Sequence, residues 1–291
     1  MDKIKNFNRL NDVYFKNLLT DEHNKQITIC FLNDILEREG NQIFTDIYFL
    51  DKENMPNIEA GKVSILDIRA KTNDNTEINI EVQVRPRKDM AKRSLYYWSK
   101  IYSSQLMKGE NYINLNNTIA INLLDFSILP YKTCHNIYHI TNDETHDRLL
   151  DDLEMHFIEL NKFTLSDIKR LRKSEKWLAL FANNCTNEEM EEIAMTEPAI
   201  KMALEYEKYF RENPELRREY ELREMAELDR RSELDLNRQE GIREGIREGE
   251  YQKSIKIAKK MLYRGNSIED IADITELSIS DIEQLKAMLN I

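Results

Sequence analysis

Hydrophobic residues near the start of the chain recur about every 3.6 positions, the spacing of one face of a helix. The series is Leu10, Phe15, Leu18, Leu19, Ile27, Ile29, Phe31, Leu32, Ile35 and Leu36. This pattern predicts helical structure over residues 7–38.

Three segments further on have the patterns of β-strands. FTDIYFLD (44–51) comes first, and KVSILDIRAK (62–71) and EINIEVQVR (77–85) follow. The last two are separated by TNDNT, a strong turn signal, and Pro86 ends the second because it cannot donate to a strand ladder. We therefore predict one strand followed by a β-hairpin.

An amphipathic helix is predicted next, over residues 87–109, where Gly109 closes it. Its apolar stripe would consist of Leu95, Trp98, Ile101 or Tyr102, and Leu106. TIAINLLDFSI (118–128) is almost continuously apolar, which is typical of a strand buried on both faces. With shorter strands near 135–141 and 153–159, the first part of the chain predicts a mixed sheet flanked by helices.

From about residue 164 the pattern is helical throughout. Residues 198–250 are dense in Glu and Arg but lack a sustained heptad, so no long coiled coil is predicted. Within them GIREGIREGE (241–250) fits either a charged helix weakened by its glycines or a flexible joint.

Residues 252–291 predict three short helices with a helix-turn-helix outline and Leu277 in the last turn. Ser267 with Asp270, and Ser280 with Glu283, have the spacing of capping boxes. The pattern as a whole predicts three parts: a domain over 1–163, a charged helical region over 164–250 and a small helical module over 251–291.

The charge of the chain is unevenly distributed. The net charge is −11, but residues 1–150 hold 19 basic and 21 acidic residues, against 23 basic and 32 acidic residues in 151–291. Acidity therefore belongs to the C-terminal half, and the N-terminal half can still present a cationic surface to nucleic acid. The C-terminal helix-turn-helix is acidic, so we interpret it as a packing or protein-interaction module.

Neither a signal peptide nor the ~18–20 apolar residues of a membrane helix is seen in the sequence. The three cysteines have no metal-type spacing and read as reduced thiols. A soluble, cytoplasmic protein is expected.

The hairpin carries the candidate chemistry. In the segment 77–85 the side chains alternate, so that Ile78 and Val82 lie on an apolar face and Glu81 on a polar one. If the turn centres on Asp74, residue numbers of opposed pairs add to 148 and Asp67 lies across from Glu81. Two carboxylates whose Cβ atoms are ~5 Å apart repel unless a cation or proton lies between them. Hard divalent ions such as Mg²⁺ bind to one or two such groups, although a polar face turned simply to water is the alternative.

Several segments together resemble the recombination-promoting nuclease (Rpn) and transposase family, a branch of the PD-(D/E)XK nucleases. Asp67 is followed after thirteen residues by Glu81-Val82-Gln83, and DVYFKNLL (12–19) precedes them. RSLYYWSKIYSSQLMKGENY (93–112), LLDF (123–126) and the GIREGIREGE repeat follow in the family's order. The resemblance implies an α+β (α/β) fold with a restriction-endonuclease-like mixed sheet, followed by an all-helical C-terminal region.

The resemblance also implies roles for individual residues. Asp67 and Glu81 would be metal ligands, with the backbone carbonyl of Val82 as a third, and Mg²⁺ or Mn²⁺ would be the cofactor. Gln83 stands where the wider superfamily has lysine, so a hydrogen-bonding amide replaces a positive charge. Asp12 is an additional candidate acid.

A basic stretch follows the hairpin and suits contacts to the phosphate backbone of nucleic acid. Its members are Arg85, Arg87, Lys88, Lys92, Arg93 and Lys100. Tyr96, Tyr97 and Trp98 are interleaved with it, and we expect Trp98 and one tyrosine to pack in the core rather than stack on bases. Cys134, His135, His139 and His146 could suggest a transition-metal site, but positions four apart on a strand span about 13 Å, so we set this aside.

The expected function is a metal-dependent DNA endonuclease linked to recombination or mobile elements. The alternatives are a nuclease-like protein that binds DNA without cutting it, and an assembly or regulatory protein that acts through its helical tail. A homodimer through the C-terminal helices is also expected, because cutting both strands needs two sites.

Overall fold

A computed structural model of the chain describes residues 7–50 and 68–290. The chain divides into two compact units, Met1–Arg223 and Glu224–Ile291. Within the described residues, no helix is both long enough and apolar enough to cross a membrane.

The first unit is built on a six-stranded mixed sheet with the strand order β1-β2-β3-β4-β6-β5. The strands are β1 (Ile47–Phe49), β2 (Ile68–Thr72), β3 (Glu77–Gln83), β4 (Thr118–Leu124), β5 (His135–Tyr138) and β6 (Leu153–Glu159). β3, β4 and β6 run parallel, whereas β1, β2 and β5 pair antiparallel with their neighbours. β4 lies between two parallel strands and every residue in it is buried, as its apolar sequence predicted.

The β2–β3 hairpin has the predicted register. Its pairs run from Ile68 opposite Ile80 to Lys71 opposite Glu77, and each pair of numbers adds to 148. The turn is stabilised by Asp74, whose Oδ1 accepts the backbone N–H of Thr76 at 3.1 Å, and by Asn75 with a φ of 68°. Asp67, the next position along, lies outside the described residues.

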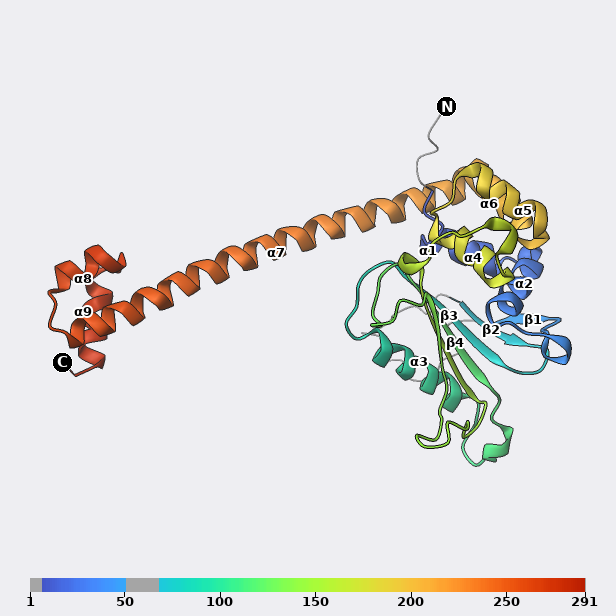
Figure 1. The fold of residues 1–291 in the computed structure, drawn as a ribbon, viewed down its shortest axis with the longest axis horizontal. Helices are drawn as coiled ribbons and strands as arrows, with labels where there is room; N and C mark the ends of the chain where they lie inside the picture. Colours follow the sequence, from blue (N-terminus) through green and yellow to red (C-terminus); the bar gives the residue numbers. More distant parts are fainter. Residues whose placement is uncertain (1–6, 51–67, 291) are drawn as a thin grey trace. The chain divides into compact units, whose positions relative to one another are not determined.

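Five helices cover one face of the sheet (Figure 1). They are α1 (Asp12–Thr20), α2 (Lys25–Ile35), α4 (Lys173–Ala182), α5 (Asn187–Thr196) and α6 (Pro198–Glu212). Their apolar side chains share one core with Ile78, Ile80 and Val82 of β3. The predicted boundary at residue 163 therefore falls inside the first unit, because α4 and α6 pack on α1 and α2.

The opposite face of the sheet is covered by α3 (Met90–Ser104). Trp98 packs there against Leu124 and Phe157, and its Nε1 donates to the carbonyl of Thr118 at 2.7 Å. The predicted stripe is wrong at Leu95, which is half exposed, whereas Ser94 and Tyr97 are buried. The helix is rotated in this way because the sheet below it presents polar as well as apolar side chains.

The second unit has its own small core. The end of α7 (Pro214–Tyr263) packs with α8 (Ile268–Thr275) and α9 (Ile279–Met288) around Leu262 and Leu277. The cap of α8 is the predicted one, with Ser267 Oγ accepting the N–H of Asp270. The cap of α9 differs from the prediction: Ser278, not Ser280, accepts from Asp281.

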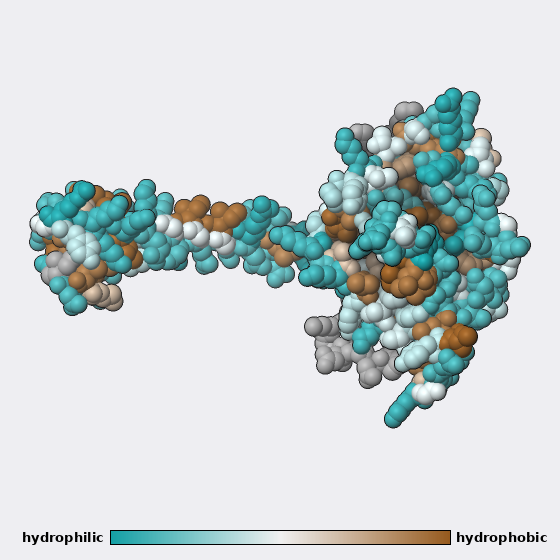
Figure 2. All heavy atoms as spheres, turned by 60° about the horizontal axis from the view of Figure 1, so that its bottom comes forward, coloured by the Kyte–Doolittle hydropathy of each residue, from teal (hydrophilic) through white to brown (hydrophobic). Residues whose placement is uncertain are grey.

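GIREGIREGE lies within one continuous helix rather than in a flexible joint, because α7 runs through all ten residues. The residues are exposed, and hydrophilic side chains dominate this helix, with apolar ones interspersed (Figure 2). The exposed apolar side chains along the helix include Leu228, Leu234, Ile242 and Ile246.

Candidate active site

The polar face of β3 is buried beneath α3. Asn79 is 4 % exposed and Glu81 1 % exposed, and both lie on the side of the strand opposite the large core. The alternative in which this face turns to water is therefore wrong. Polar groups buried under a helix need hydrogen-bond partners, so the polar layer between α3 and the sheet is a candidate binding or catalytic site.

Glu81 has an incompletely satisfied carboxylate. Its Oε1 lies 3.4 Å from Nη2 of Arg93, whereas its Oε2 has no hydrogen-bond partner among the described residues. Burial raises the pKa of the Glu81 carboxyl above its ordinary value, and the charges of Arg93 and Arg87 offset part of this effect. Oε2 of Glu81 is therefore a buried oxygen to which a further ligand could bind.

Arg93 is the cation closest to this carboxylate. It projects from the first turns of α3, its side chain is only 10 % exposed, and its guanidinium lies 4.7 Å from the centre of the Tyr97 ring. Its Nε is buried and has no hydrogen-bond partner among the described residues. The sequence predicted a nucleic-acid contact for Arg93, and the structure brings it against Glu81 beneath the surface.

Further polar groups extend the layer between α3 and the sheet. Ser94 of α3 hydrogen-bonds to Asn122 of β4, whose Nδ2 donates to the carbonyl of His156 at 2.9 Å. Asn79 Oδ1 is buried and, within the described part of the chain, has no hydrogen-bond partner. Asn79, Glu81 and Arg93 thus each have one buried polar atom without a partner among the described residues, and such atoms call for an explanation such as a bound ion or a catalytic role.

Gln83 and Val82 complete the motif at the end of β3. Gln83 is half-buried, and its carbonyl accepts the N–H of Asp125 at 3.0 Å. The side chain of Val82 belongs to the opposite core, which leaves its backbone as the only part that could serve the polar face.

Asp12 is placed away from this layer. It lies on α1, in the group of helices on the other face of the sheet, and its carboxylate pairs with Arg223 at 2.6 and 2.8 Å.

Three of the remaining predicted cations form an exposed rim at the start of α3. Arg87, Lys88 and Lys92 are exposed, and Arg87 pairs with Asp89 at 2.9 Å. Arg85 is partly buried. Lys100 is also partly buried, further along α3, and its Nζ lies 5.6 Å from the centre of the Tyr96 ring.

The interleaved aromatic residues pack largely as expected. Trp98 and Tyr97 are 9 % and 6 % exposed, so the core interpretation is confirmed for both, whereas Tyr96 is 52 % exposed.

The described residues of this face offer one carboxylate oxygen of the kind that a hard divalent cation binds. Glu81 Oε2 is a buried, unpartnered carboxylate oxygen, and Mg²⁺ and Mn²⁺ prefer oxygen ligands. Among the described residues no three His, Cys, Asp or Glu side chains converge as a metal cluster. The proposed second carboxylate, Asp67, is outside that set of residues.

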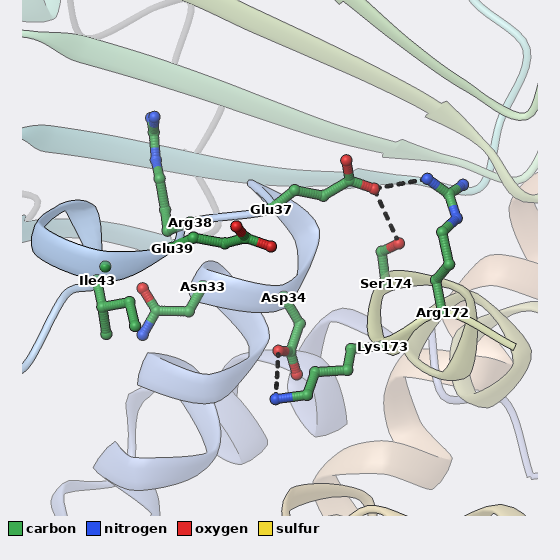
Figure 3. A pocket seen from close by; sticks show the side chains of 10 residues that line it. Asn33, Asp34, Glu37, Arg38, Glu39, Ile43, Arg172, Lys173 and Ser174 are labelled. Atoms are coloured by element: carbon green, nitrogen blue, oxygen red, sulfur yellow. Dashed lines mark hydrogen bonds and ion pairs between the residues drawn. The ribbon is translucent and has the colours of Figure 1, made fainter.

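A pocket of the first unit lies elsewhere (Figure 3). It has a volume of about 550 Å³ and is lined by α2, the turn after it and the start of α4. Two of its carboxylates are paired with cations: Glu37 with Arg172 at 2.7 Å, and Asp34 with Lys173 at 4.0 Å. The pocket holds none of the motif residues, so the buried layer at Glu81 remains the candidate site.

A chain of polar side chains around the buried His156, which the sequence did not predict, lies on the α2 side of the sheet. Arg38 pairs with Glu154 at 2.9 Å, Glu154 contacts His156 Nε2 at 2.8 Å, and His156 Nδ1 contacts His135 Nε2 at 2.8 Å. His139 instead contacts the carbonyl of Leu153. His135 and His156 thus belong to this network, whereas His139 does not.

The fold and this layer define an α+β protein with a mixed sheet between helices and an acidic site on a central strand. A family model described as PD-(D/E)XK nuclease family transposase matches residues 9–237. The chain therefore belongs to that family, as the order of its motifs predicted. No curated protein and no solved structure matches the chain.

Proposed function

We propose that the protein is a metal-dependent DNA endonuclease that serves recombination or a mobile element. The observation that carries the proposal is Glu81, a buried carboxylate beside a largely buried arginine, with one oxygen that has no partner among the described residues. Membership of a nuclease and transposase family supports the same reaction class and the link to mobile elements.

Asp67, Glu81 and the carbonyl of Val82 would hold Mg²⁺ or Mn²⁺. When bound, such an ion polarises a phosphate and makes a bound water more acidic. Hydrolysis then joins a water oxygen to phosphorus and breaks one P–O ester bond, and the released alcohol takes up a proton. The helix α3 would exclude bulk water from the buried part of the site, which strengthens every charge interaction within it.

The exposed cations would hold the substrate. Arg87, Lys88 and Lys92 are positioned at the start of α3 to bind phosphate groups, which are shared by all sequences. No base-reading element accompanies them in the described part of the chain, so we propose weak sequence discrimination.

One observation favours a second candidate function. Gln83 has no charge to offer, so a protein that binds DNA without cutting it is consistent with the motif. This candidate predicts DNA binding that does not depend on a divalent ion.

The test is cleavage of supercoiled plasmid in Mg²⁺, Mn²⁺ or EDTA by the wild type, Asp67→Ala and Glu81→Ala. We expect nicked or linear product that needs the ion and disappears in both variants. Glu212→Ala, which removes an exposed carboxylate at the end of α6, is the matched control and should cut like the wild type. Asp12→Ala tests whether the acid paired with Arg223 takes part. Intact plasmid under all three conditions would leave DNA binding without cleavage as the better proposal.

A further inference from the structure

We propose that Arg93 supplies the positive charge that Gln83 does not, by contacting a non-bridging oxygen of the phosphodiester beside Glu81. This inference rests on the proposed function and deepens it. It concerns the one feature in which the motif departs from the wider superfamily, the glutamine at position 83.

The first argument is position. Among the residues that the structure describes, Arg93 is the cation whose side chain contacts the Glu81 carboxylate. Arg87 is exposed and held by Asp89 through two hydrogen bonds, at 2.9 and 3.1 Å. Lys88 and Lys92 are exposed on the outer rim, so they suit the flanking phosphates better than the reacting one.

The second argument is that the Arg93 guanidinium contacts Glu81 but still has an N–H donor without a partner among the described residues. A charge-assisted hydrogen bond between arginine and a carboxylate is normally about 2.7–2.9 Å long, and the contact between Arg93 and Glu81 is 3.4 Å. Its Nε is buried and unpartnered among the described residues. A guanidinium has five N–H donors in a planar fork, so it can donate to its carboxylate and to a phosphate oxygen at the same time.

The third argument is orientation. The Tyr97 ring lies one helical turn beyond Arg93, and the guanidinium lies 4.7 Å from its centre. This stacking, together with burial to 10 % exposure, restricts the side chain to the layer between α3 and the sheet. A donor held in place before the reaction stabilises developing charge at little reorganisation cost.

The test compares the wild type, Arg93→Gln, Arg93→Lys and the double variant Arg93→Gln/Gln83→Lys. Plasmid nicking is measured in Mn²⁺, and binding of Mn²⁺ alone is measured by calorimetry. Lys208→Gln, an exposed cation on α6, is the control for loss of charge and should nick like the wild type.

We expect Arg93→Gln to lose about 100-fold in nicking rate, the usual effect of removing one transition-state donor. It should bind Mn²⁺ at least as tightly as the wild type, because a cation beside the ligand carboxylate has been removed. Arg93→Lys should retain more activity than Arg93→Gln. The double variant should recover at least tenfold over Arg93→Gln, because lysine at position 83 restores the charge from the strand.

Two results would overturn the role of Arg93 while leaving the endonuclease intact. One is nicking by Arg93→Gln within threefold of the wild type. The other is a joint loss of nicking and of Mn²⁺ binding that the second substitution does not restore, since this indicates a structural role. A wild type that nicks nothing would overturn the proposed function itself, and the assignment of Arg93 with it.

Discussion

Two glutamates of the sheet have opposite electrostatic environments. Burial raises the pKa of Glu81, whose Oε2 lacks a partner among the described residues. Glu154 is partly buried, but hydrogen bonds and charges from His156 and Arg38 outweigh the effect of burial and lower its pKa to about 2. The first carboxylate is therefore destabilised in its charged form by folding, and the second is stabilised.

The same substitution should accordingly have opposite effects at these two positions. In EDTA at pH 7, Glu81→Gln should raise the free energy of unfolding by about 1 kcal/mol. In Mg²⁺ the same variant should not cut plasmid. Glu154→Gln should lower it by roughly 1–3 kcal/mol, because Arg38 and His156 lose a charged partner. Urea unfolding followed by circular dichroism measures both. Destabilisation of equal size in the two variants would contradict this view of the Glu81 site.

His135 makes the stability of the first unit sensitive to acid. Burial, with His156 and Arg172 nearby and Glu154 opposing them, lowers its pKa from 6.5 to about 3. In the unfolded chain the imidazole takes up a proton near pH 6.5, whereas in the folded protein it stays neutral until about pH 3. The stabilisation is therefore present above pH 6.5 and lost as the pH falls towards 3.

The contribution of His135 can be isolated by substitution. Between pH 6 and 4 the wild type should lose up to about 1.4 kcal/mol per pH unit through this one residue. His135→Asn removes the titrating group, so its unfolding free energy should fall less steeply over the same range. Urea titrations at several pH values test this, and parallel curves for the two proteins would contradict it.

At the scale of the element, α3 determines what the hairpin can do. A two-stranded amphipathic hairpin would leave Glu81 in water, with an ordinary carboxylate and no defined partner. The helix covers that face, and its buried positions recur at Met90, Ser94, Tyr97 and Ile101, at helical spacing. Arg93, next to one of these positions, is thereby carried beneath the surface, whereas Lys92 remains outside.

The three glycines of the repeat in α7 offer a test at the same scale. Gly241, Gly245 and Gly249 lie in the helix, and a Cβ added at any of them would meet nothing within 4 Å. Alanine at each position should stabilise the helix by roughly 0.5–1 kcal/mol. Hydrogen exchange of the backbone amides around residues 241–253 should slow accordingly.

Gly265, just after the same helix, is the matched control. Its φ is +78°, which a side chain disfavours, although a Cβ there would also meet nothing within 4 Å. Gly265→Ala should therefore destabilise the second unit by about 1 kcal/mol. Faster hydrogen exchange in the triple alanine variant would contradict the continuous helix. An unchanged free energy of unfolding in Gly265→Ala would contradict the backbone conformation assigned to its end.

At the scale of the whole molecule, the working part of the chain should lie in the first unit. The family match ends at residue 237, and the second unit has a separate core. A chain ending at residue 237 should fold and nick plasmid at a rate within about threefold of the full chain. Its sedimentation, compared with that of the full chain, tests the predicted homodimer through the C-terminal helices.

The choice of this end point follows from the packing of α6. Removal of residues 198–291 would strip Ile200, Ala203 and Phe210 from the large core, so loss of activity would report unfolding. If the chain ending at 237 folds but does not cut, while Asp67→Asn leaves the full chain active, an assembly or regulatory role of the tail becomes the better proposal.

Most elements and the hairpin register were predictable from the sequence, because they depend on local periodicity and turn chemistry. Short-range structure follows from local signals: the alternation in EINIEVQ, the turn at Asp74 and the continuous apolar run of β4. The family and the fold class followed from the order of such segments. The candidate status of Glu81 came from its motif, and the proposed pairing with Asp67 stays a prediction.

Which of these side chains are buried, and which of them meet, depends on tertiary packing. Arg93 and Glu81 are 12 positions apart, His135 and His156 are 21 apart, and Arg38 and Glu154 are 116 apart. No local pattern encodes such contacts, because burial depends on what another segment places above a face. That covering converts an ordinary glutamate on an amphipathic strand into a desolvated acid with a neighbouring cation.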